Sequence, residues 1–403
     1  MRFLLVFTII LFSLPLAIFQ PFLGVITWCW IALFRPQDFA WGAHGLPFAE
    51  MVAGATILGC FVKRNLKFYF LKQSYLLLIL FLLMIISSYF AINSNLSFPK
   101  LFEFAKIFLF TYLITFLVID LHKLRLLFLV LALSLGFVGA KAGIYGLFHG
   151  AKIHGYGGFF AGENDLALGL NMIAPLLFYQ SFVEKNRILK FVLLLFFVST
   201  LMCVVFTYSR GGFLGLSTCV GLIIWKSKRR ILLLPLIIGV VLFLIQHVPK
   251  QYIQRIQTIK TYQQDQSAMN RIYLWKRAIE LTKQYPWTGV GLKNFERLND
   301  LFNDVHNSHL QILVEVGVPA FIVFELLILS TIYDLRKIRI STNDKIFQNY
   351  SNMLEVSLMV YLVEGTFLNR HDSELLYYLI GSAISLIYIF RQLNQVYTNG
   401  YPK

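Results

Sequence analysis

An arginine flanked by small and polar residues is the first feature of the chain that could do chemistry. The stretch 207–213 reads Thr-Tyr-Ser-Arg-Gly-Gly-Phe, and Arg210 falls where one apolar run ends and the next begins. A guanidinium group can bind phosphate oxygens through two parallel hydrogen bonds, and glycine lets backbone approach a ligand closely. An interfacial arginine can also simply extend toward lipid headgroups. Because that role needs neither Ser209 nor the two glycines, we favour an anion-binding site.

Two histidines stand three residues apart directly before another apolar run. His306 and His309 would share one face of a helix, and a histidine with a pKa of about 6.5 suits general-base chemistry at neutral pH. Zinc normally takes three or four protein ligands, and the nearest acids, Asp300 and Asp304, complete no recognised metal-binding pattern. The alternative is a capping or interfacial histidine, which fits His309 better than His306.

Acidic residues and one lysine are further candidates. Glu163 and Asp165 follow a glycine-rich stretch, where they can cap the next helix or orient sugar hydroxyls; capping alone would explain Asp165. Asp372 and Glu374 form an acid-x-acid pair that could hold a divalent cation beside a diphosphate, although a charged turn is the commoner case. Lys141 lies inside an otherwise apolar run and needs a partner there.

The elements that must position these residues are membrane helices. Hydrophobic residues make up 58% of the 403 residues and charged residues only 14%, whereas a soluble domain is about 25% charged. Apolar runs long enough to cross a bilayer recur along the chain. They cover residues 3–19, 21–34, 46–62, 73–91, 101–119, 124–147, 166–183, 190–206, 211–225, 231–247, 310–333, 353–368 and 375–390. The first two fit either two short helices or one re-entrant pair, so we expect an all-α polytopic membrane protein with 12 or 13 spans.

Basic residues give the expected orientation. There are 36 Lys and Arg against 20 Asp and Glu, for a net charge of +16, and the basic clusters fall on every second loop from residue 63 onward. Short cytoplasmic loops collect Lys and Arg, so these loops and the C-terminus are expected in the cytoplasm. The four cysteines all lie within apolar runs and predict neither a disulfide framework nor a metal site.

One outer segment, residues 248–309, breaks this charge pattern with nine basic and five acidic residues. Loops longer than about 60 residues escape the positive-inside rule, so the excess reflects either relaxed topology or a surface for an anionic, lipid-linked substrate. Residues 267–285 predict an amphipathic helix. Its expected apolar face carries Ile272, Trp275, Ile279 and Thr282. We therefore divide the chain into an N-terminal transmembrane bundle (1–247), this loop with the binding and catalytic residues (248–309), and C-terminal transmembrane helices with a cytoplasmic tail (310–403).

Four short motifs follow one another along the chain. They are Gly162-Glu163-Asn164-Asp165-Leu166-Ala167; Tyr208-Ser209-Arg210-Gly211-Gly212; Arg271-x-x-x-Trp275 followed by Pro286-x-x-Gly289-Val290-Gly291 and Phe295; and Asp304-x-His306-Asn307-x-x-Leu310 continuing to Gly317. Together they resemble the O-antigen ligase and polymerase family of bacterial inner-membrane proteins. The stretches Arg35-Pro36-x-x-x-x-Trp41-Gly42 and Lys141-Ala142-Gly143 look most like the branch of O-glycosylation ligases found with exosortase systems.

The resemblance implies a GT-C-like fold whose periplasmic loop carries amphipathic helices. It also implies an inverting, metal-independent glycosyl transfer on the periplasmic face, with no cofactor. The donor would be a glycan on a polyprenyl diphosphate, and the acceptor a hydroxyl of a glycan, lipid or protein. Carried over by motif, Arg210 and Arg271 bind the diphosphate and His306 activates the acceptor hydroxyl. Two arginines can stabilise a leaving diphosphate in place of a metal, while a base is still needed for the hydroxyl.

Further residues are expected to contact the substrate. They are Lys141, Glu163, Asp165, Ser209, Asp304, His309 and Asp372. Two of them depart from the family pattern: His309 stands where a tyrosine or aliphatic residue is expected, and Glu163 where Asp or Asn is common. The expected partners are the lipid-linked donor, the acceptor and the bilayer, and not nucleic acid.

Two other functions remain open. A repeat-unit polysaccharide polymerase of the same superfamily would share these motifs, and the acceptor does not follow from them. A transporter or flippase of lipid-linked sugars would also have many helices and positive charge. Transporters usually carry ionisable residues near the bilayer midplane and pseudo-symmetric halves, whereas here the polar groups gather at the outer ends of spans, so transport is the less favoured function.

Overall fold

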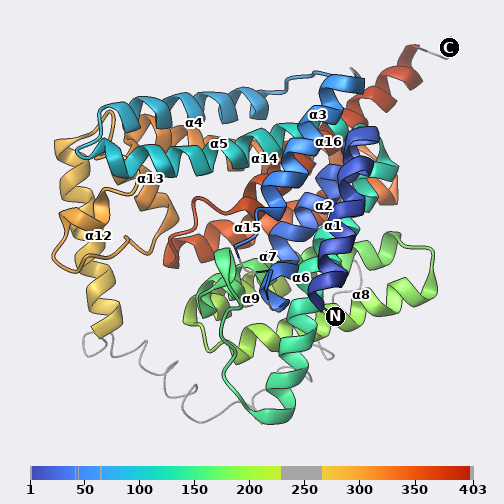
Figure 1. Cartoon of the computed structure of the whole chain (residues 1–403), viewed down its shortest axis with the longest axis horizontal. Coiled ribbons are helices and arrows are strands. Elements are labelled where there is room, and N and C mark those ends of the chain that lie inside the picture. The colour runs from blue at the N-terminus through green and yellow to red at the C-terminus, as the bar shows by residue number, and fades with distance from the viewer. Residues whose placement is uncertain (1, 41, 44, 64–65, 228–265, 400–403) are drawn as a thin grey trace.

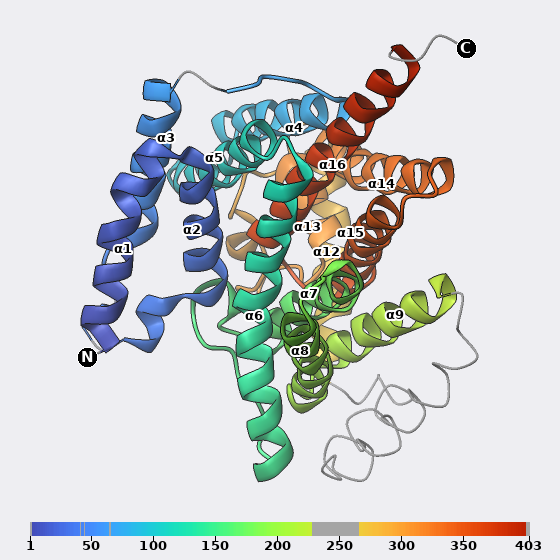
Figure 2. The same ribbon diagram turned by 90° about the vertical axis from the view of Figure 1, so that its right-hand side faces the viewer.

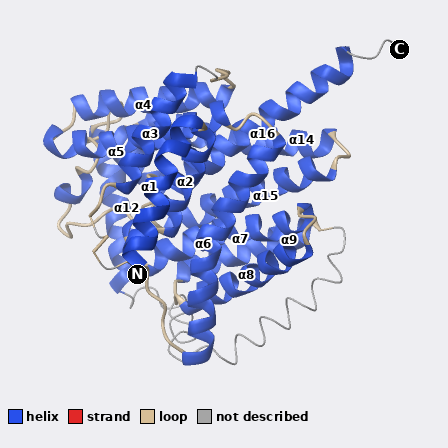
Figure 3. Ribbon diagram, turned by 45° about the vertical axis from the view of Figure 1, so that its right-hand side comes forward, coloured by secondary structure: helices blue, strands red, loops and turns tan. Residues whose placement is uncertain are grey.

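The computed structural model describes residues 2–40, 42–43, 45–63, 66–227 and 266–399, and every regular element in these ranges is helical (Figure 1, Figure 3). The predicted all-α membrane fold is therefore confirmed. Seven described helices are long and apolar enough to cross a membrane, and one more is apolar but shorter. The total of 12 or 13 spans stays a prediction, because the expected span 231–247, like Trp41, lies outside the described residues.

The described part contains fourteen α-helices and four short 3-10 helices. The seven candidate spans are α1 (Arg2–Phe19), α4 (Lys72–Tyr89), α6 (Leu121–His149), α7 (Glu163–Val183), α8 (Arg187–Phe206), α14 (Val318–Ser341) and α16 (Glu374–Asn399). The other α-helices are α2 (Pro21–Phe34), α3 (Phe48–Lys63), α5 (Ser94–Leu117), α9 (Arg210–Lys226), α12 (Gln266–Gln284), α13 (Ser308–Val316) and α15 (Lys345–Glu364). The 3-10 helices are η1 (Pro36–Phe39), η2 (Gly158–Phe160), η4 (Phe295–Leu298) and η5 (Gly365–Phe367).

The helices pack around α7. In its apolar stretch 83% of residues are buried, against 17% in α1 at the edge of the bundle. α7 contacts α6, α8, α9 and α15, while α1 packs mainly on α2 and α3. Figure 2 shows α1, α2 and α3 on one side of α6, with α8 and α9 on the other. Loops that leave α7 and its neighbours at the same end are therefore brought close together.

One end of the bundle, here called the outer end, gathers the turns predicted to lie outside. The α4–α5 turn joins the α12–α13 segment, because Ile92 N donates to Val290 O at 3.1 Å. Ile153 N donates to Phe206 O at 2.8 Å, which joins the α6–α7 and α8–α9 connections. In Figure 1 the α4–α5 turn and α12 lie together, and the C-terminal end of α16 lies far from them. At the opposite end, Lys72 at the start of α4 pairs with Asp334 near the end of α14 at 3.0 Å, next to two of the predicted basic loops.

The predicted span 310–333 starts in the wrong place. The structure has two helices there, α13 and α14, separated at Gly317, whose φ is 94°. The break accommodates the turn 286–291: Val318 N donates to Pro286 O at 2.8 Å, and Gly291 N donates to Glu315 O at 2.9 Å. The residues on both sides of Gly317 are apolar, so hydropathy alone shows one continuous run.

Replacing Gly317 with alanine is expected to destabilise the protein. A Cβ at this position would lie 2.5 Å from the Trp287 carbonyl oxygen, and φ would remain in the left-handed region. Such strain costs about 1–3 kcal/mol, so the midpoint of thermal unfolding should fall. Gly221→Ala in α9 is the matched control, since a Cβ there has nothing within 4 Å. Equal midpoints for the two variants would show that the break at Gly317 is not needed.

The amphipathic helix predicted at 267–285 is confirmed as α12, but its buried face is different. Leu274, Ala278 and Leu281 are buried, together with the predicted Thr282, whereas the predicted Ile279 is 45% exposed. The buried side chains form a small hydrophobic core with residues of the following loop and α13. Its other members are Val290, Phe295, Val305 and Val314. The helix therefore packs on its own loop, which the periodicity of α12 alone does not reveal.

Candidate functional site

His306 lies in a short loop that is held on both sides. Its φ of 54° is in the left-handed region, a conformation that persists in a non-glycine residue only where the surroundings enforce it. Before it, Trp275 Nε1 donates to Val305 O at 3.1 Å, and Val305 N donates to Gln311 Oε1 at 2.9 Å. After it, Asn307 caps the first turn of α13. These contacts fix the backbone from which the imidazole projects.

The surroundings of His306 favour the neutral imidazole. Burial lowers its pKa below the ordinary 6.5, and Arg271 lowers it further, while Asp304 and Asp165 act in the opposite direction. Arg271 lies four residues before Trp275 and so projects from the same face of α12. At neutral pH one ring nitrogen of the imidazole therefore carries a lone pair, as a general base requires.

A third arginine, Arg370, lies near His306 and Arg271, although it was not among the predicted site residues. Its guanidinium pairs with the Asp165 carboxylate through two hydrogen bonds of 2.7 Å and lies 4.8 Å from the centre of the Phe159 ring. Its backbone N–H donates to Ser308 Oγ at 2.9 Å, which ties its turn to the start of α13. Arg370 also lowers the pKa of His306. In the sequence Arg370 is only one residue of a charged turn. Its pairing with Asp165 could not be predicted, because 205 residues separate the two.

Arg210 begins α9 next to the same turns. Ser209 caps that helix by accepting a hydrogen bond from Gly212 N at 2.9 Å, and its hydroxyl donates to Asn164 Oδ1 at 2.6 Å. Asn164 is the neighbour of Asp165, so the start of α9 is linked to the Arg370 pair. Glycine at 212 is explained by packing, since a Cβ there would lie 2.6 Å from the Cβ of Ala167. The sequence suggested that glycine here lets a ligand approach the backbone. At Gly212 the group that approaches closely is helix α7.

Glu163 and Lys141 lie farther along the outer end. Glu163, in the first turn of α7, pairs with Lys152 at 2.7 Å and lies 3.5 Å from His154. Lys141 of α6 is exposed, and its Nζ lies 5.2 Å from the centre of the Phe39 ring. The partner expected for this lysine is therefore an aromatic ring. Lys141 and Lys152 both line a mainly apolar groove of about 580 Å³, and their contact with substrate stays a prediction.

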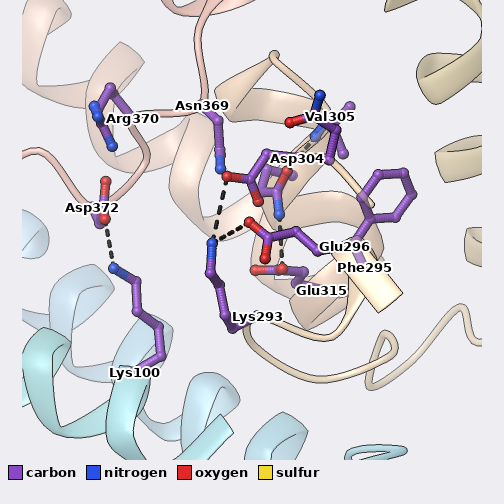
Figure 4. Close-up of polar contacts among 12 residues, drawn as sticks. Lys100, Lys293, Phe295, Glu296, Asp304, Val305, Glu315, Asn369, Arg370 and Asp372 are labelled. Atoms are coloured by element: carbon purple, nitrogen blue, oxygen red, sulfur yellow. Dashed lines mark hydrogen bonds and ion pairs between the residues drawn. The ribbon is translucent and has the colours of Figure 1, made fainter. Parts of the chain in front are cut away.

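Asp304 is part of a polar cluster beside the His306 loop (Figure 4). Lys293 Nζ lies 3.5 Å from Asp304 Oδ2 and also hydrogen-bonds to Glu296. Glu315, buried in α13, faces the same cluster; burial, and secondarily Asp304, raises its pKa to about 8. Burial therefore favours the neutral form of Glu315, which limits the negative charge of this cluster.

Asp372 and Glu374 each have a separate partner. Asp372 Oδ2 pairs with Lys100 at 2.6 Å; burial alone would raise its pKa, but Lys100 and neighbouring cationic groups lower it to about 2 (Figure 4). Glu374 Oε2 accepts a hydrogen bond from Tyr378 at 3.2 Å. Within the described ranges, no three His, Cys, Asp or Glu side chains are grouped so as to hold a metal ion.

His309, the second predicted histidine, has protein partners at both ring nitrogens. Nδ1 is hydrogen-bonded to Glu325 of α14, and Nε2 lies 3.3 Å from the Leu362 carbonyl oxygen of α15. The ring therefore connects α13 to the two helices that follow it. These contacts favour a structural role for His309 and favour His306 as the base.

Replacing His309 with alanine is accordingly expected to reduce stability more than chemistry. Glu325 and the Leu362 carbonyl, both half-buried, lose hydrogen bonds. Such a loss costs about 1–3 kcal/mol, so the thermal midpoint should fall while folded protein still turns over. Thermal unfolding and initial rates of the same preparation would separate the two effects. An unchanged midpoint with a lost rate would instead place His309 in the reaction.

Two family models match parts of the chain. Residues 194–324 match the model described as O-antigen ligase, and residues 1–169 match a family of unknown function. No curated protein matches. The first match contains Arg210, Arg271 and His306, whereas Asp165 falls within the second and Arg370 within neither. The more specific exosortase-associated branch stays a prediction. Residues 194–324 of this all-helical membrane protein are thus similar to the O-antigen ligase family.

Proposed function

We propose that the protein transfers a glycan from a polyprenyl diphosphate carrier to an acceptor hydroxyl, with inversion at the anomeric carbon. The match of residues 194–324 to the O-antigen ligase family model supports glycosyl transfer of the ligase or polymerase type. The observation that carries the finer proposal is His306, which is held in a constrained loop with a lowered pKa beside Arg271 and Arg370. A neutral base next to cationic groups suits attack of a hydroxyl on an anionic, diphosphate-linked donor.

The proposed step uses the chain's own side chains. His306 accepts the proton of the acceptor hydroxyl as its oxygen bonds to the anomeric carbon, and the bond from that carbon to the diphosphate oxygen breaks on the opposite face. Arg210 and Arg271 bind the diphosphate and stabilise the negative charge that develops on it. Arg370 is a positioning residue, since its pair with Asp165 joins the turn before α16 to the start of α7. No metal ion is required by this scheme.

We place the reaction on the periplasmic side of a bacterial inner membrane, with the C-terminus in the cytoplasm. This placement is supported by the grouping of His306, Arg271, Arg370 and Asp165 at the outer end. It is also supported by the Lys- and Arg-rich loops at the other end, since short cytoplasmic loops collect such residues.

The test is transfer in reconstituted vesicles that contain lipid-linked glycan and acceptor, with and without a chelator. We expect covalent transfer in both conditions; movement of glycan across the membrane without a covalent product would contradict the proposal and indicate a transporter. The size of the products distinguishes the two enzymatic forms. A ligase moves an assembled chain onto a different acceptor, whereas a polymerase produces a ladder of repeat units on the carrier.

A further inference from the structure

A second cavity, separate from the His306 loop but sharing Arg370, lies at the outer end between α2, α3, α5 and α16. It has a volume of about 450 Å³, within the range of ligand pockets of roughly 300–1,000 Å³. Its charged lining residues are Lys100, Lys106, Arg370, Glu50, Glu103, Asp372 and Glu374. Trp28, Phe159 and Tyr378 contribute aromatic rings to the wall.

The charges of this cavity do not fit a diphosphate. Its three cationic side chains are accompanied by four carboxylates, and Lys100 is already paired with Glu103 at 2.8 Å and with Asp372 at 2.6 Å. A diphosphate would face these carboxylates and have to compete with them for Lys100. The cavity therefore differs from the site proposed for the leaving group, where Arg210 and Arg271 are invoked.

The same lining suits a polyhydroxylated ligand. Carboxylates accept hydrogen bonds from sugar hydroxyls and ammonium groups donate to them, while aromatic rings give an apolar surface for the C–H face of a sugar ring. One polar atom also lacks a protein partner: Asp372 Oδ1 is buried and makes no hydrogen bond within the described structure. The Arg370 guanidinium forms part of the cavity wall. The backbone N–H of Arg370 donates to Ser308 Oγ at 2.9 Å, so the residue joins the cavity to the loop that carries His306.

We infer that this cavity binds the sugar unit that carries the acceptor hydroxyl. The inference rests on the proposed glycosyl transfer and assigns its acceptor subsite to the side of Arg370 away from the diphosphate. The acceptor is accordingly glycan-bearing, and its terminal sugar is held by Glu103, Lys106 and Asp372. The hydroxyl that reacts projects past Arg370 toward His306.

The test uses Glu103→Gln, which keeps the side-chain length, and Lys106→Gln, whose side chain is one bond shorter; each substitution removes a charge. Both residues lie in α5, outside the catalytic group. The probe is the soluble oligosaccharide released by mild acid from the producing cells' own surface glycan. Its binding to the detergent-solubilised full chain is measured by saturation-transfer NMR, and the acceptor KM and donor KM are measured in vesicles. Glu280→Gln and Lys276→Gln, on the exposed surface of α12, are the matched controls.

Loss of a charge-assisted hydrogen bond should raise the acceptor KM about tenfold or more and weaken oligosaccharide binding. The donor KM should stay within about twofold of wild type. Both control variants should behave like wild type. Normal acceptor KM and binding in the cavity variants would overturn the assignment while leaving the transfer function intact. A rise in the donor KM alone would also overturn it. Wild-type protein that binds the oligosaccharide but transfers nothing would instead contradict the proposed function.

Discussion

Replacing His306 with alanine is expected to lower the rate of glycan transfer by about 10²–10⁴-fold, the usual contribution of a general base. The reason is that the acceptor hydroxyl then loses the group that takes its proton during attack. Because His306 is not proposed to bind the diphosphate, the KM for the lipid-linked donor should change little. Initial rates at saturating donor and acceptor, in vesicles with equal amounts of folded protein, would measure the loss.

His122→Ala is the matched control for this variant. His122 is an exposed histidine in the first turn of α6, at the opposite end of the bundle, and its loss should leave the rate unchanged. The His306 variant removes a residue with φ of 54°, so its thermal midpoint must be compared with wild type. A full rate in a correctly folded His306→Ala protein would rule out this histidine as the base.

The helices were largely predictable because long apolar runs leave few alternatives to membrane helices. The predicted ends of several spans agree closely with α4, α6 and α8. The break at Gly317 was missed because it depends on hydrogen bonds to the turn 286–291, which no local pattern contains. The orientation of α12 was misjudged for the same reason, since the loop that buries Leu274 and Leu281 follows the helix in the chain.

The site was predictable only where its residues carry a local motif. His306 and Arg271 stand in recognisable stretches, and the structure places them close enough for Arg271 to influence the pKa of His306. Arg370 was missed as a site residue because its meaning depends on Asp165, which is distant in sequence. The contacts of His309 with Glu325 and Leu362, which favour a structural role, could not be predicted either, because both partners lie on other helices. Sequence spacing thus indicates which side chains can react. Hydrogen bonds between residues far apart in the sequence decide which of these side chains already have a protein partner.

Replacing Arg271 with alanine is the second change with a large expected effect, and it should alter both the rate and its pH dependence. Loss of one preorganised cationic donor to a developing anion reduces the rate by about 10²–10³-fold. His306 acts as a base only when neutral, so the rate rises with pH and levels off above its pKa. Since Arg271 lowers that pKa, the variant should level off at a higher pH than wild type. Initial rates across the acidic and neutral range measure both effects.

Two further variants separate charge from geometry at this position. Arg271→Lys keeps the positive charge, so the pH at which the rate levels off should stay near that of wild type, while the loss of bidentate binding keeps the rate low. Asp304→Asn removes a charge that raises the pKa of His306, so its rate should level off at a lower pH. Arg297→Ala, an exposed arginine of the same loop, is the control and should change neither quantity. If the pH profile of Arg271→Ala matched wild type, the guanidinium would not be acting on His306, and its role would be limited to the diphosphate.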